Sequence, residues 1–305
     1  MSLIPRVSVL MPAYNVEKYI GEAIESILNQ TFTDFEFIII NDGSTDNTAK
    51  IIREYTQKDK RIRFINHKKN KGLIAVLNEG LDLCRGEYIA RMDSDDISLP
   101  ERLAKQIKYM DNHPECGVVG AWIKKFGYKV RSNDIFKYPP IMKPLDFVLR
   151  GNQVAHPCTM IRNSVLKTYN IKYKSQYKYA EDYAFWGEIV MFTEIHNLQE
   201  ILLLYRWHTS NVSVTHYQEQ SECAERIRRN ISSRISAHQD DISTLLNMSY
   251  ETNKRFYLFN ILPIVRRKQY STIKTKYYLF ERLPLIKEQD EYIYLFDRIK
   301  IGKLK

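Results

Sequence analysis

The N-terminal third of the chain alternates between strand patterns and helix patterns, which restricts the possible folds more than any other feature. Short apolar runs predict four buried strands, over residues 6–11, 35–40, 61–66 and 88–92. Apolar residues recur at helical spacing in the three intervening segments, over residues 15–29, 47–58 and 73–83. Because strands that alternate with helices form parallel sheets with right-handed crossovers, the sequence predicts an α/β fold with a mostly parallel sheet flanked by helices.

Polar residues gather directly after three of these strands, at residues 12–15, 41–44 and 93–96. In an open parallel sheet, ligands bind at the carboxyl ends of the strands, so we expect the three clusters to line one crevice. The first strand is not followed by G-x-G-x-x-G, and the chain has no G-x-x-x-x-G-K-S/T motif. Both a dinucleotide-binding enzyme and a P-loop protein are therefore disfavoured.

The third cluster holds three carboxylates, Asp93, Asp95 and Asp96, immediately after the buried strand. An apolar core does not tolerate such side chains unless they are paired, solvated or bound to a cation. Their place at a strand end suggests a hard divalent metal and, with it, a phosphate group. A helix cap is the alternative interpretation, with Asp96 or Ser98 starting a helix near Pro100 and the other acids on its dipole.

The composition limits the partners and the compartment. The chain has 46 Lys and Arg residues against 36 Asp and Glu residues, and its net charge of +10 indicates an anionic partner such as phosphate, a membrane surface or nucleic acid. Four scattered cysteines predict neither a zinc site nor a disulfide framework, as is typical of a reducing cytoplasm. Neither an apolar run of about 18 residues nor a signal peptide is recognisable, so we expect a cytoplasmic protein.

The character of the chain changes near residue 215. Helical patterns over residues 216–237 and 242–262 predict a helical C-terminal region, rich in basic and aromatic residues, up to residue 305. Basic clusters beside aromatic side chains are typical of a surface that lies on anionic lipid. The alternative is an appendage whose aromatic residues pack on the rest of the chain or on a second subunit, as in a homodimer.

Four motifs in the N-terminal part resemble the nucleotide-sugar half of glycosyltransferase family 2. They read V-S-V-L-M-P-A-Y-N, I-I-I-N-D-G-S-T-D-N-T, N-K-G-L-I-A-V-L-N-E-G-L and G-E-Y-I-A-R-M-D-S-D-D. The resemblance continues with H-P-C-T-M-I-R, A-E-D-Y-A-F-W and Y-R-W-H, and it covers about residues 5–215. It implies a GT-A fold with a Rossmann-like sheet, a nucleoside-diphosphate sugar donor, a divalent metal (Mn²⁺ or Mg²⁺) and inversion at the anomeric carbon.

The resemblance implies a nucleotide site that begins at the end of the first strand. Pro12, Ala13 and Tyr14 would cradle the base, with the tyrosine ring stacked on it; the alternative is an ordinary strand end. Glu17 lies one helical turn on, where it can reach the ribose or simply serve the helix dipole.

Asp42 corresponds to the family's base-reading aspartate. Its carboxylate would accept from the N3–H of uracil, which favours a uridine donor, whereas the alternative is a turn aspartate before Gly43. Lys71 falls where the family often places a contact to the base, although a solvated loop lysine fits the sequence equally well.

Asp93 and Asp95 match the family's D-x-D motif, and alternation places both on one side of an extended segment. Asp95 is the expected direct metal ligand, whereas Asp93 would lie nearer the ribose or the metal's water shell. His208 follows the strand predicted over residues 198–207 and would complete the metal shell, unless it is a surface histidine beside Trp207. Asp96 is expected to cap the next helix or to hold neighbouring side chains.

Asp182 is the candidate catalytic base, because the family usually assigns this role to the aspartate of its E-D pair. An inverting transfer is a single displacement, in which a carboxylate takes the proton of the acceptor hydroxyl. Glu181 is the second candidate, or else it orients acceptor hydroxyls. Without the resemblance, two adjacent acids at a helix start are more commonly plain dipole caps.

Three further residues are candidates for the sugar and acceptor pockets. Arg206 could meet the diphosphate, and His156 is expected to shape the acceptor pocket rather than to bind metal. Trp186 lies one helical turn past Asp182, where it could stack on a sugar ring or pack in the core.

The resemblance therefore predicts a hexosyltransferase with a catalytic domain over residues 1–215, followed by the helical region 216–305. The nucleotide-binding half would span about residues 1–98, and the acceptor half about residues 99–215. The expected reaction moves a sugar, most readily from a UDP-sugar, to a hydroxyl of a glycan or lipid-linked glycan. The setting would be bacterial surface polysaccharide or lipooligosaccharide synthesis, in the cytoplasm or on the inner face of its membrane.

Two other classes compete with this prediction. One is a catalytically inactive protein that only binds nucleotide sugars. The presence of Asp93, Asp95 and Asp182 argues against it. The other is a basic nucleic-acid-binding protein. The acids gather at the predicted site, and the chain carries no known nucleic-acid-binding motif, so no nucleic-acid partner is expected.

Overall fold

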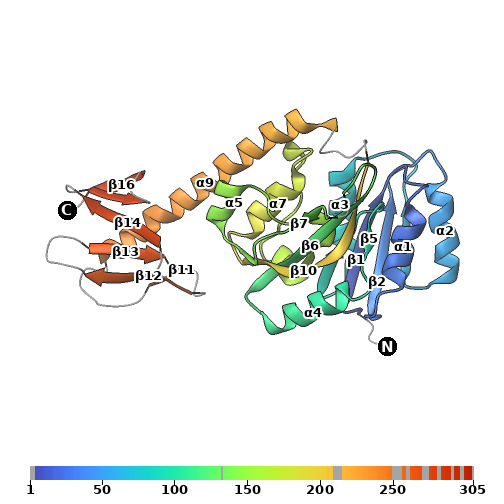
Figure 1. The fold of residues 1–305 in the computed structure, drawn as a ribbon, viewed down its shortest axis with the longest axis horizontal. Coiled ribbons are helices and arrows are strands. Elements are labelled where there is room, and N and C mark those ends of the chain that lie inside the picture. Colours follow the sequence, from blue (N-terminus) through green and yellow to red (C-terminus); the bar gives the residue numbers. More distant parts are fainter. Residues whose placement is uncertain are drawn as a thin grey trace. The chain divides into compact units, whose positions relative to one another are not determined.

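The computed structural model describes residues 4–131, 133–208 and 215–248, together with strand segments between residues 256 and 303. The chain divides into two compact units, residues 1–233 and residues 234–305, which are described separately. Figure 1 shows the first unit as a twisted sheet, coloured blue to yellow, with helices packed against it.

The first unit is built on a ten-stranded sheet of order β3-β2-β1-β4-β9-β6-β10-β5, with β7 paired to β6 and β8 paired to β10. Its strands are β1 (Val7–Ala13), β2 (Phe35–Asn41), β3 (Ile62–Asn66), β4 (Tyr88–Arg91), β5 (Ile97–Ser98), β6 (Cys116–Gly127), β7 (Ile135–Phe136), β8 (Ile141–Met142), β9 (Met160–Arg162) and β10 (Glu194–Trp207). Its helices are α1 (Ile20–Leu28), α2 (Thr48–Lys58), α3 (Leu73–Leu83), α4 (Arg102–Asn112), α5 (Pro144–Arg150), η1 (His156–Cys158), α6 (Asn163–Thr168), η2 (Ser175–Tyr177), α7 (Glu181–Ile189) and the first part of α9 (Tyr217–Met248).

The N-terminal half of the sheet is parallel, as the alternation of strands and helices predicts. β1 lies between β2 and β4, and β3 pairs with β2, all in the same direction. Every residue of β1 and β2 is buried, which requires helices on both faces of the sheet. All four strand ends therefore meet at one edge, where the polar clusters after β1, β2 and β4 come together.

The second half of the sheet is mixed. β9 is antiparallel to both of its neighbours, β4 and β6, and β10 returns to a parallel pairing with β6. The strand predicted over residues 198–207 begins earlier, at Glu194, because His196 and Asn197 are buried there and Asn197 Nδ2 donates to the carbonyl of Pro139 at 2.8 Å.

A short antiparallel contact joins β5 to the end of β10, with Leu203 opposite Ser98 and Leu204 opposite Ile97. β5 directly follows the three carboxylates after β4. This pairing therefore brings the last residues of β10, and His208 beyond them, next to Asp95 and Asp96.

The first unit extends beyond the predicted boundary near residue 215. Ile227 and Ile231 of α9 are buried, and a Cβ built on Gly187 of α7 would lie 2.7 Å from Ile231 Cδ1. The first turns of α9 thus pack closely on α7, which explains why the unit ends at residue 233.

Two basic residues of this part of α9, Arg226 and Arg229, are exposed and also contact protein. Arg226 Nη1 donates to the carbonyl of Gln176 at 3.4 Å and lies over the ring of Tyr177. Arg229 forms an ion pair of 3.2 Å with Glu225. Both interpretations of this basic cluster, a lipid-facing surface and an appendage packed on protein, stay predictions.

The second unit differs from the predicted helical region. α9 ends at Met248, and the described segments beyond it are antiparallel strands: β11 (Phe256–Leu258), β12 (Leu262–Gln269), β13 (Thr275–Leu279), β14 (Leu283–Gln289), β15 (Tyr292–Leu295) and β16 (Ile299–Lys303). The helix predicted up to residue 262 is therefore wrong at β11 and β12. Aromatic and β-branched residues are abundant there and favour a pleated strand, although their spacing also fits a helix. Within the part of the chain described, no helix is both long and apolar enough to cross a membrane.

Candidate active site

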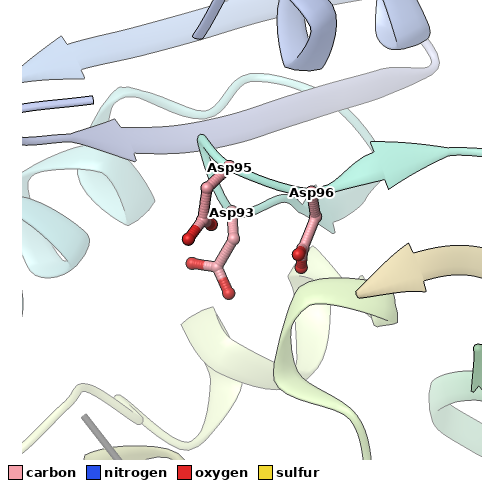
Figure 2. Close-up of side chains that lie close together, drawn as sticks. All are labelled: Asp93, Asp95 and Asp96. Carbon is pink, nitrogen blue, oxygen red and sulfur yellow. The ribbon is translucent and has the colours of Figure 1, made fainter. Parts of the chain in front are cut away.

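Three carboxylates lie together on the turn after β4. One oxygen from each of Asp93, Asp95 and Asp96 falls within 4.8 Å of the others, and Figure 2 shows the three side chains projecting from this turn into the same space. Asp96 is only 1% exposed. Its Oδ1 accepts the backbone N–H of Arg206 at 2.8 Å, whereas its Oδ2 is buried without a hydrogen-bond partner. A buried carboxylate oxygen without a hydrogen-bond partner destabilises the folded state unless a cation or a hydrogen-bond donor binds it.

The electrostatics of the cluster also call for positive charge. Burial raises the pKa of Asp93, which the nearby Arg91 guanidinium opposes through an ion pair. Burial raises the pKa of Asp96 further, and the charges of Asp93 and Asp95 add to this effect. Three carboxylates with one cationic partner fit a divalent cation, since hard cations prefer carboxylate oxygens.

The end of β10 holds the carboxylate turn from the other side. Arg206 Nε donates to the carbonyl of Asp95 at 2.7 Å, and its guanidinium lies 4.5 Å from the ring centroid of Tyr19. Its Nη2 forms an ion pair of 2.5 Å with Glu22. Arg206, predicted as a contact to the diphosphate, is thus engaged in positioning the turn that carries Asp95 and Asp96.

His208 lies at the cluster, as its predicted metal role requires. Its Nε2 is 3.0 Å from Asp95 Oδ2, and its ring stacks on Tyr19 at a centroid distance of 5.8 Å. An imidazole and carboxylates at one point make a donor set that suits Mn²⁺ or Mg²⁺ through the oxygens and Mn²⁺ through the nitrogen.

The turn after β1 interlocks with the turn after β2. Asn15, at a φ of 51°, donates its backbone N–H to Ser44 Oγ at 2.9 Å, and its Oδ1 accepts the backbone N–H of Thr45 at 2.8 Å. Pro12 and Ala13 complete β1, and the Tyr14 side chain beyond them is 48% exposed. An exposed ring on a fixed turn has the form of a stacking platform.

Two predicted nucleotide residues are engaged in shaping these turns. Glu17 Oε2 accepts both the backbone N–H and the side-chain amide of Asn47 at 2.9 Å, at the start of α2. Asp42 is buried, and its two oxygens accept the backbone N–H groups of Lys71 at 2.7 Å and Gly72 at 2.9 Å. Each carboxylate oxygen keeps a second lone pair, so Asp42 still has acceptor capacity for a base.

Lys71 is exposed on this turn. Its Nζ forms an ion pair of 3.2 Å with Glu79, and His67 Nε2 reaches the same carboxylate oxygen at 3.0 Å. Because the Lys71 side chain is 49% exposed, this pair contributes little and can exchange for a ligand.

Asp182 and Glu181 begin α7, where the charge of Arg91 acts on both. Asp182 Oδ1 accepts the backbone N–H of Tyr183 at 2.7 Å, and Oδ2 accepts Asn152 Nδ2 at 2.8 Å. Burial raises the pKa of Asp182, while these hydrogen bonds and the charge of Arg91 favour its ionised form. Burial and the neighbouring Asp182 raise the pKa of Glu181 to about 7.

Arg91 links the two acidic groups and was not singled out from the sequence. Its side chain is 3% exposed, it pairs with Asp93, and its charge lowers the pKa of both Glu181 and Asp182. A sequence signal did exist, because a charged residue inside an apolar strand must find a partner.

A cavity of about 310 Å³ opens beside Asp182. The loop at Asn152 and the start of α7 form one side, and Tyr217, Gln220 and Arg228 of α9 form another. The contribution of α9 was also missed, because its packing against α7 is a long-range contact that no local pattern reveals.

Trp186 and His156 are buried, so core packing is the better of the two interpretations that the sequence left open for Trp186. Trp186 is fully buried, with its ring 5.7 Å from that of His156 in an edge-to-face contact. His156 Nε2 lies 2.7 Å from the hydroxyl of Tyr173, and burial together with the charge of Arg91 lowers the pKa of His156 well below 6.5. α7 is apolar around most of its circumference, so its core-facing side could not be identified from periodicity.

Comparison with known proteins decides the family. The model of glycosyl transferase family 2 matches residues 8–169, more than half of the chain. The chain belongs to this family. An uncharacterised glycosyltransferase of Haemophilus influenzae is 33% identical to this family 2 glycosyltransferase over 98% of the chain and 96% of its own length. The O-antigen biosynthesis glycosyltransferase WbnJ of Escherichia coli is 34% identical, over 73% of the chain and 88% of its own length.

Solved structures agree with the family and the fold of this glycosyltransferase. S. aureus TarS 1–349 in complex with UDP-GlcNAc matches with a TM-score of 0.62 and 25% identity, over 81% of this chain and 73% of that one. The mannosyltransferase PcManGT from Pyrobaculum calidifontis, in complex with GDP-Man and Mn²⁺, is 14% identical with a TM-score of 0.53, which speaks to the fold alone. The predicted GT-A fold and glycosyltransferase class are thereby confirmed.

Proposed function

We propose that this enzyme is an inverting, metal-dependent hexosyltransferase. It moves a sugar from a UDP-sugar to a hydroxyl of a glycan or lipid-linked glycan, in the synthesis of a bacterial surface polysaccharide or lipooligosaccharide. The observation that carries the proposal is a pair of acidic groups that both interact with Arg91: a carboxylate cluster with an unpartnered oxygen, and Asp182 at an open cavity. The UDP-GlcNAc complex of TarS and the O-antigen role of WbnJ support the choice of donor and pathway class.

The donor nucleotide would occupy the edge formed by the turns after β1, β2 and β4. Tyr14 offers an exposed ring to the base beside Pro12 and Ala13, and Asp42 offers acceptor lone pairs to its edge. Lys71 supplies positive charge nearby, and Asp93 lies where a ribose would meet the carboxylate cluster.

Asp95, Asp93 and His208 are the residues that would hold Mn²⁺ or Mg²⁺. The fit rests on the unpartnered Oδ2 of Asp96 and on the raised pKa of Asp93 and Asp96, since both effects reflect too little positive charge at the cluster. When bound, the ion would neutralise the charge that builds on the leaving diphosphate.

Asp182 is the proposed base. The acceptor oxygen forms a bond to the anomeric carbon from the face opposite the diphosphate, and the bond from that carbon to the diphosphate breaks with its electron pair. Asp182 takes the hydroxyl proton as the new bond forms. Asn152 holds the Asp182 carboxylate in place through the hydrogen bond of 2.8 Å, and Glu181 orients acceptor hydroxyls.

Release of UDP from a panel of UDP-sugars with Mn²⁺ tests the proposal. In Asp182→Asn, we expect turnover to fall by about 10²–10⁴-fold while binding of UDP with Mn²⁺ is retained, because only the base is lost. Asp82→Asn is the matched control, since Asp82 is exposed and pairs with Lys172. Full activity in Asp182→Asn would rule out this residue as the base. A wild-type protein that neither binds nor consumes any nucleotide sugar would contradict the proposed activity.

A further inference from the structure

The cavity beside Asp182 has a cationic and an aromatic residue on its α9 wall. We propose that this wall is an acceptor subsite for a sugar that carries an anionic group, with Arg228 binding the carboxylate or phosphate. The inference rests on the proposed function, because it takes Asp182 as the base. It adds the chemical class of the acceptor and the residue that selects it.

Helical spacing puts the residues that line the cavity on one face of α9. Tyr217, Gln220, Ser221, Ala224 and Arg228 follow one another at steps of three, one, three and four residues, and all of them line the cavity. Ile227 and Ile231 point away from it and are buried against α7, at Gly187. The helix is therefore anchored by one side and presents the other to the cavity.

Arg228 is held in place without being neutralised. Its guanidinium hydrogen-bonds the Tyr183 hydroxyl, and that hydroxyl in turn donates to the carbonyl of Phe147. Among the side chains that the structure describes, no carboxylate lies within 4.0 Å of Arg228, whereas the neighbouring Arg229 pairs with Glu225. A guanidinium has five donors, so Arg228 retains several for an anion.

Tyr217 borders the same cavity and is 73% exposed. It precedes Arg228 by about 16 Å along the helix axis, so a single sugar unit held by Arg228 does not stack on it. The cavity of about 310 Å³ is at the lower end of small-molecule sites, which commonly span about 300–1,000 Å³. It suits one sugar unit better than a long segment of glycan.

Arg228 is the cation among the residues that line the cavity, and Asp182 is the carboxylate. An anionic group on the acceptor would therefore bind at Arg228, where it is least repelled by Asp182. A neutral acceptor would gain no charge pairing from Arg228. A hydrogen bond also fixes the position of α9 at the cavity. Gln220 Nε2 donates to the carbonyl of Tyr179 at 2.9 Å, which ties α9 to the loop before α7.

Direct binding of matched probes to the full chain tests the proposal. The first pair is 4-nitrophenyl β-glucuronide against 4-nitrophenyl β-glucoside, and the second is glucose 6-phosphate against glucose. The first pair isolates a carboxylate and the second a phosphate. Each dissociation constant is measured by ligand-observed NMR with UDP and Mn²⁺ present and again without them. Binding of UDP with Mn²⁺ is titrated in parallel.

We expect the wild type to bind at least one anionic probe about 10-fold more tightly than its neutral partner, as for a charge-assisted hydrogen bond. Arg228→Gln should abolish that preference and leave the neutral probe unchanged, and Arg228→Lys should restore part of it. Tyr217→Ala should leave the preference unchanged, because one sugar unit at Arg228 does not reach Tyr217. Arg229→Gln is the control, because Arg229 is 75% exposed and paired with Glu225, and it should behave as wild type.

Equal binding of anionic and neutral probes by the wild type, or no binding of either, would overturn the inference. So would a preference that survives in Arg228→Gln. The proposed donor site can fail independently: a protein that prefers the anionic probes but does not bind UDP with Mn²⁺ keeps the subsite and loses the proposed function.

Discussion

The contact between α7 and α9 makes a quantitative prediction, because it places the first turns of α9 in the catalytic unit. Ile231 is 1% exposed, and a Cβ added to Gly187 would lie 2.7 Å from its Cδ1. Ile231→Ala should destabilise the unit by about 2–5 kcal/mol, the usual cost of emptying a buried Ile site. Gly187→Ala should cost about 1–3 kcal/mol in overpacking, offset by up to about 1 kcal/mol of helix propensity.

The double variant is the sharper test, since the two defects compensate each other. The methyl group of Ala at position 187 would occupy part of the space that Ile231 vacates. We therefore expect the double variant to be more stable than the sum of the single changes by about 0.5–3 kcal/mol. Ile141→Ala is the matched control, because Ile141 is 42% exposed, and it should change stability by no more than about 0.5 kcal/mol.

Tryptophan fluorescence during urea unfolding measures these values for the relevant unit. All three tryptophans, Trp122, Trp186 and Trp207, lie within residues 1–233, and Trp186 is next to Gly187. Single variants that leave the free energy of unfolding unchanged, or strictly additive values in the double variant, would mean that α9 does not pack on α7. The acceptor subsite on α9 would then lose its wall.

Two further predictions concern buried carboxylates. Glu36→Gln should destabilise the protein by about 3–5 kcal/mol at neutral pH. Burial alone would raise the pKa of Glu36, but hydrogen bonds from Arg85, Ser8 and Arg63 lower it. The stabilisation by ionised Glu36 is therefore fully present above the unfolded pKa of about 4.5, and it is lost as the pH falls through the lower pKa of the folded state. Unfolding between pH 7 and about pH 2.5 checks this; a deficit in the variant that does not shrink as the pH falls below 4.5 would contradict it. Asn152→Ala should move the acidic limb of the kcat/KM profile to higher pH, because the Asn152 hydrogen bond favours ionised Asp182. A pH–rate profile with an unshifted limb would assign Asn152 no such role.

The sequence was sufficient for the parallel half of the fold. β1 and β2 are buried on both faces and therefore appear as continuous apolar runs, and α3 has the predicted bounds, Leu73–Leu83. Where a segment is amphipathic and its neighbours are close in sequence, local patterns carry the information. The C-terminal strands lacked this signal, because their aromatic and basic composition fits helical spacing as well as pleated pairing.

The sequence identified the carboxylate cluster and His208 as neighbours in a candidate site but not the side chains that surround them. The carboxylate cluster and His208 meet because β5 pairs with β10, a contact between segments more than a hundred residues apart. The same pairing engages Arg206 with Asp95 and Asp96 rather than leaving it open to a diphosphate. The burial of Trp186 and the position of Tyr217 depend on how α7 and α9 pack, which spacing along either helix does not determine.

The central claim is that the turn after β4 binds a nucleotide through a divalent metal. Isothermal titration of UDP into the wild type, once with Mn²⁺ and once with EDTA, tests it most directly, with Asp95→Asn as the variant and Asp82→Asn as its control. The account predicts binding that requires Mn²⁺ and weakens by about 10-fold or more in Asp95→Asn, since that variant removes a charged ligand. Equal UDP affinity with Mn²⁺ and with EDTA, or an undiminished affinity in Asp95→Asn, would contradict it.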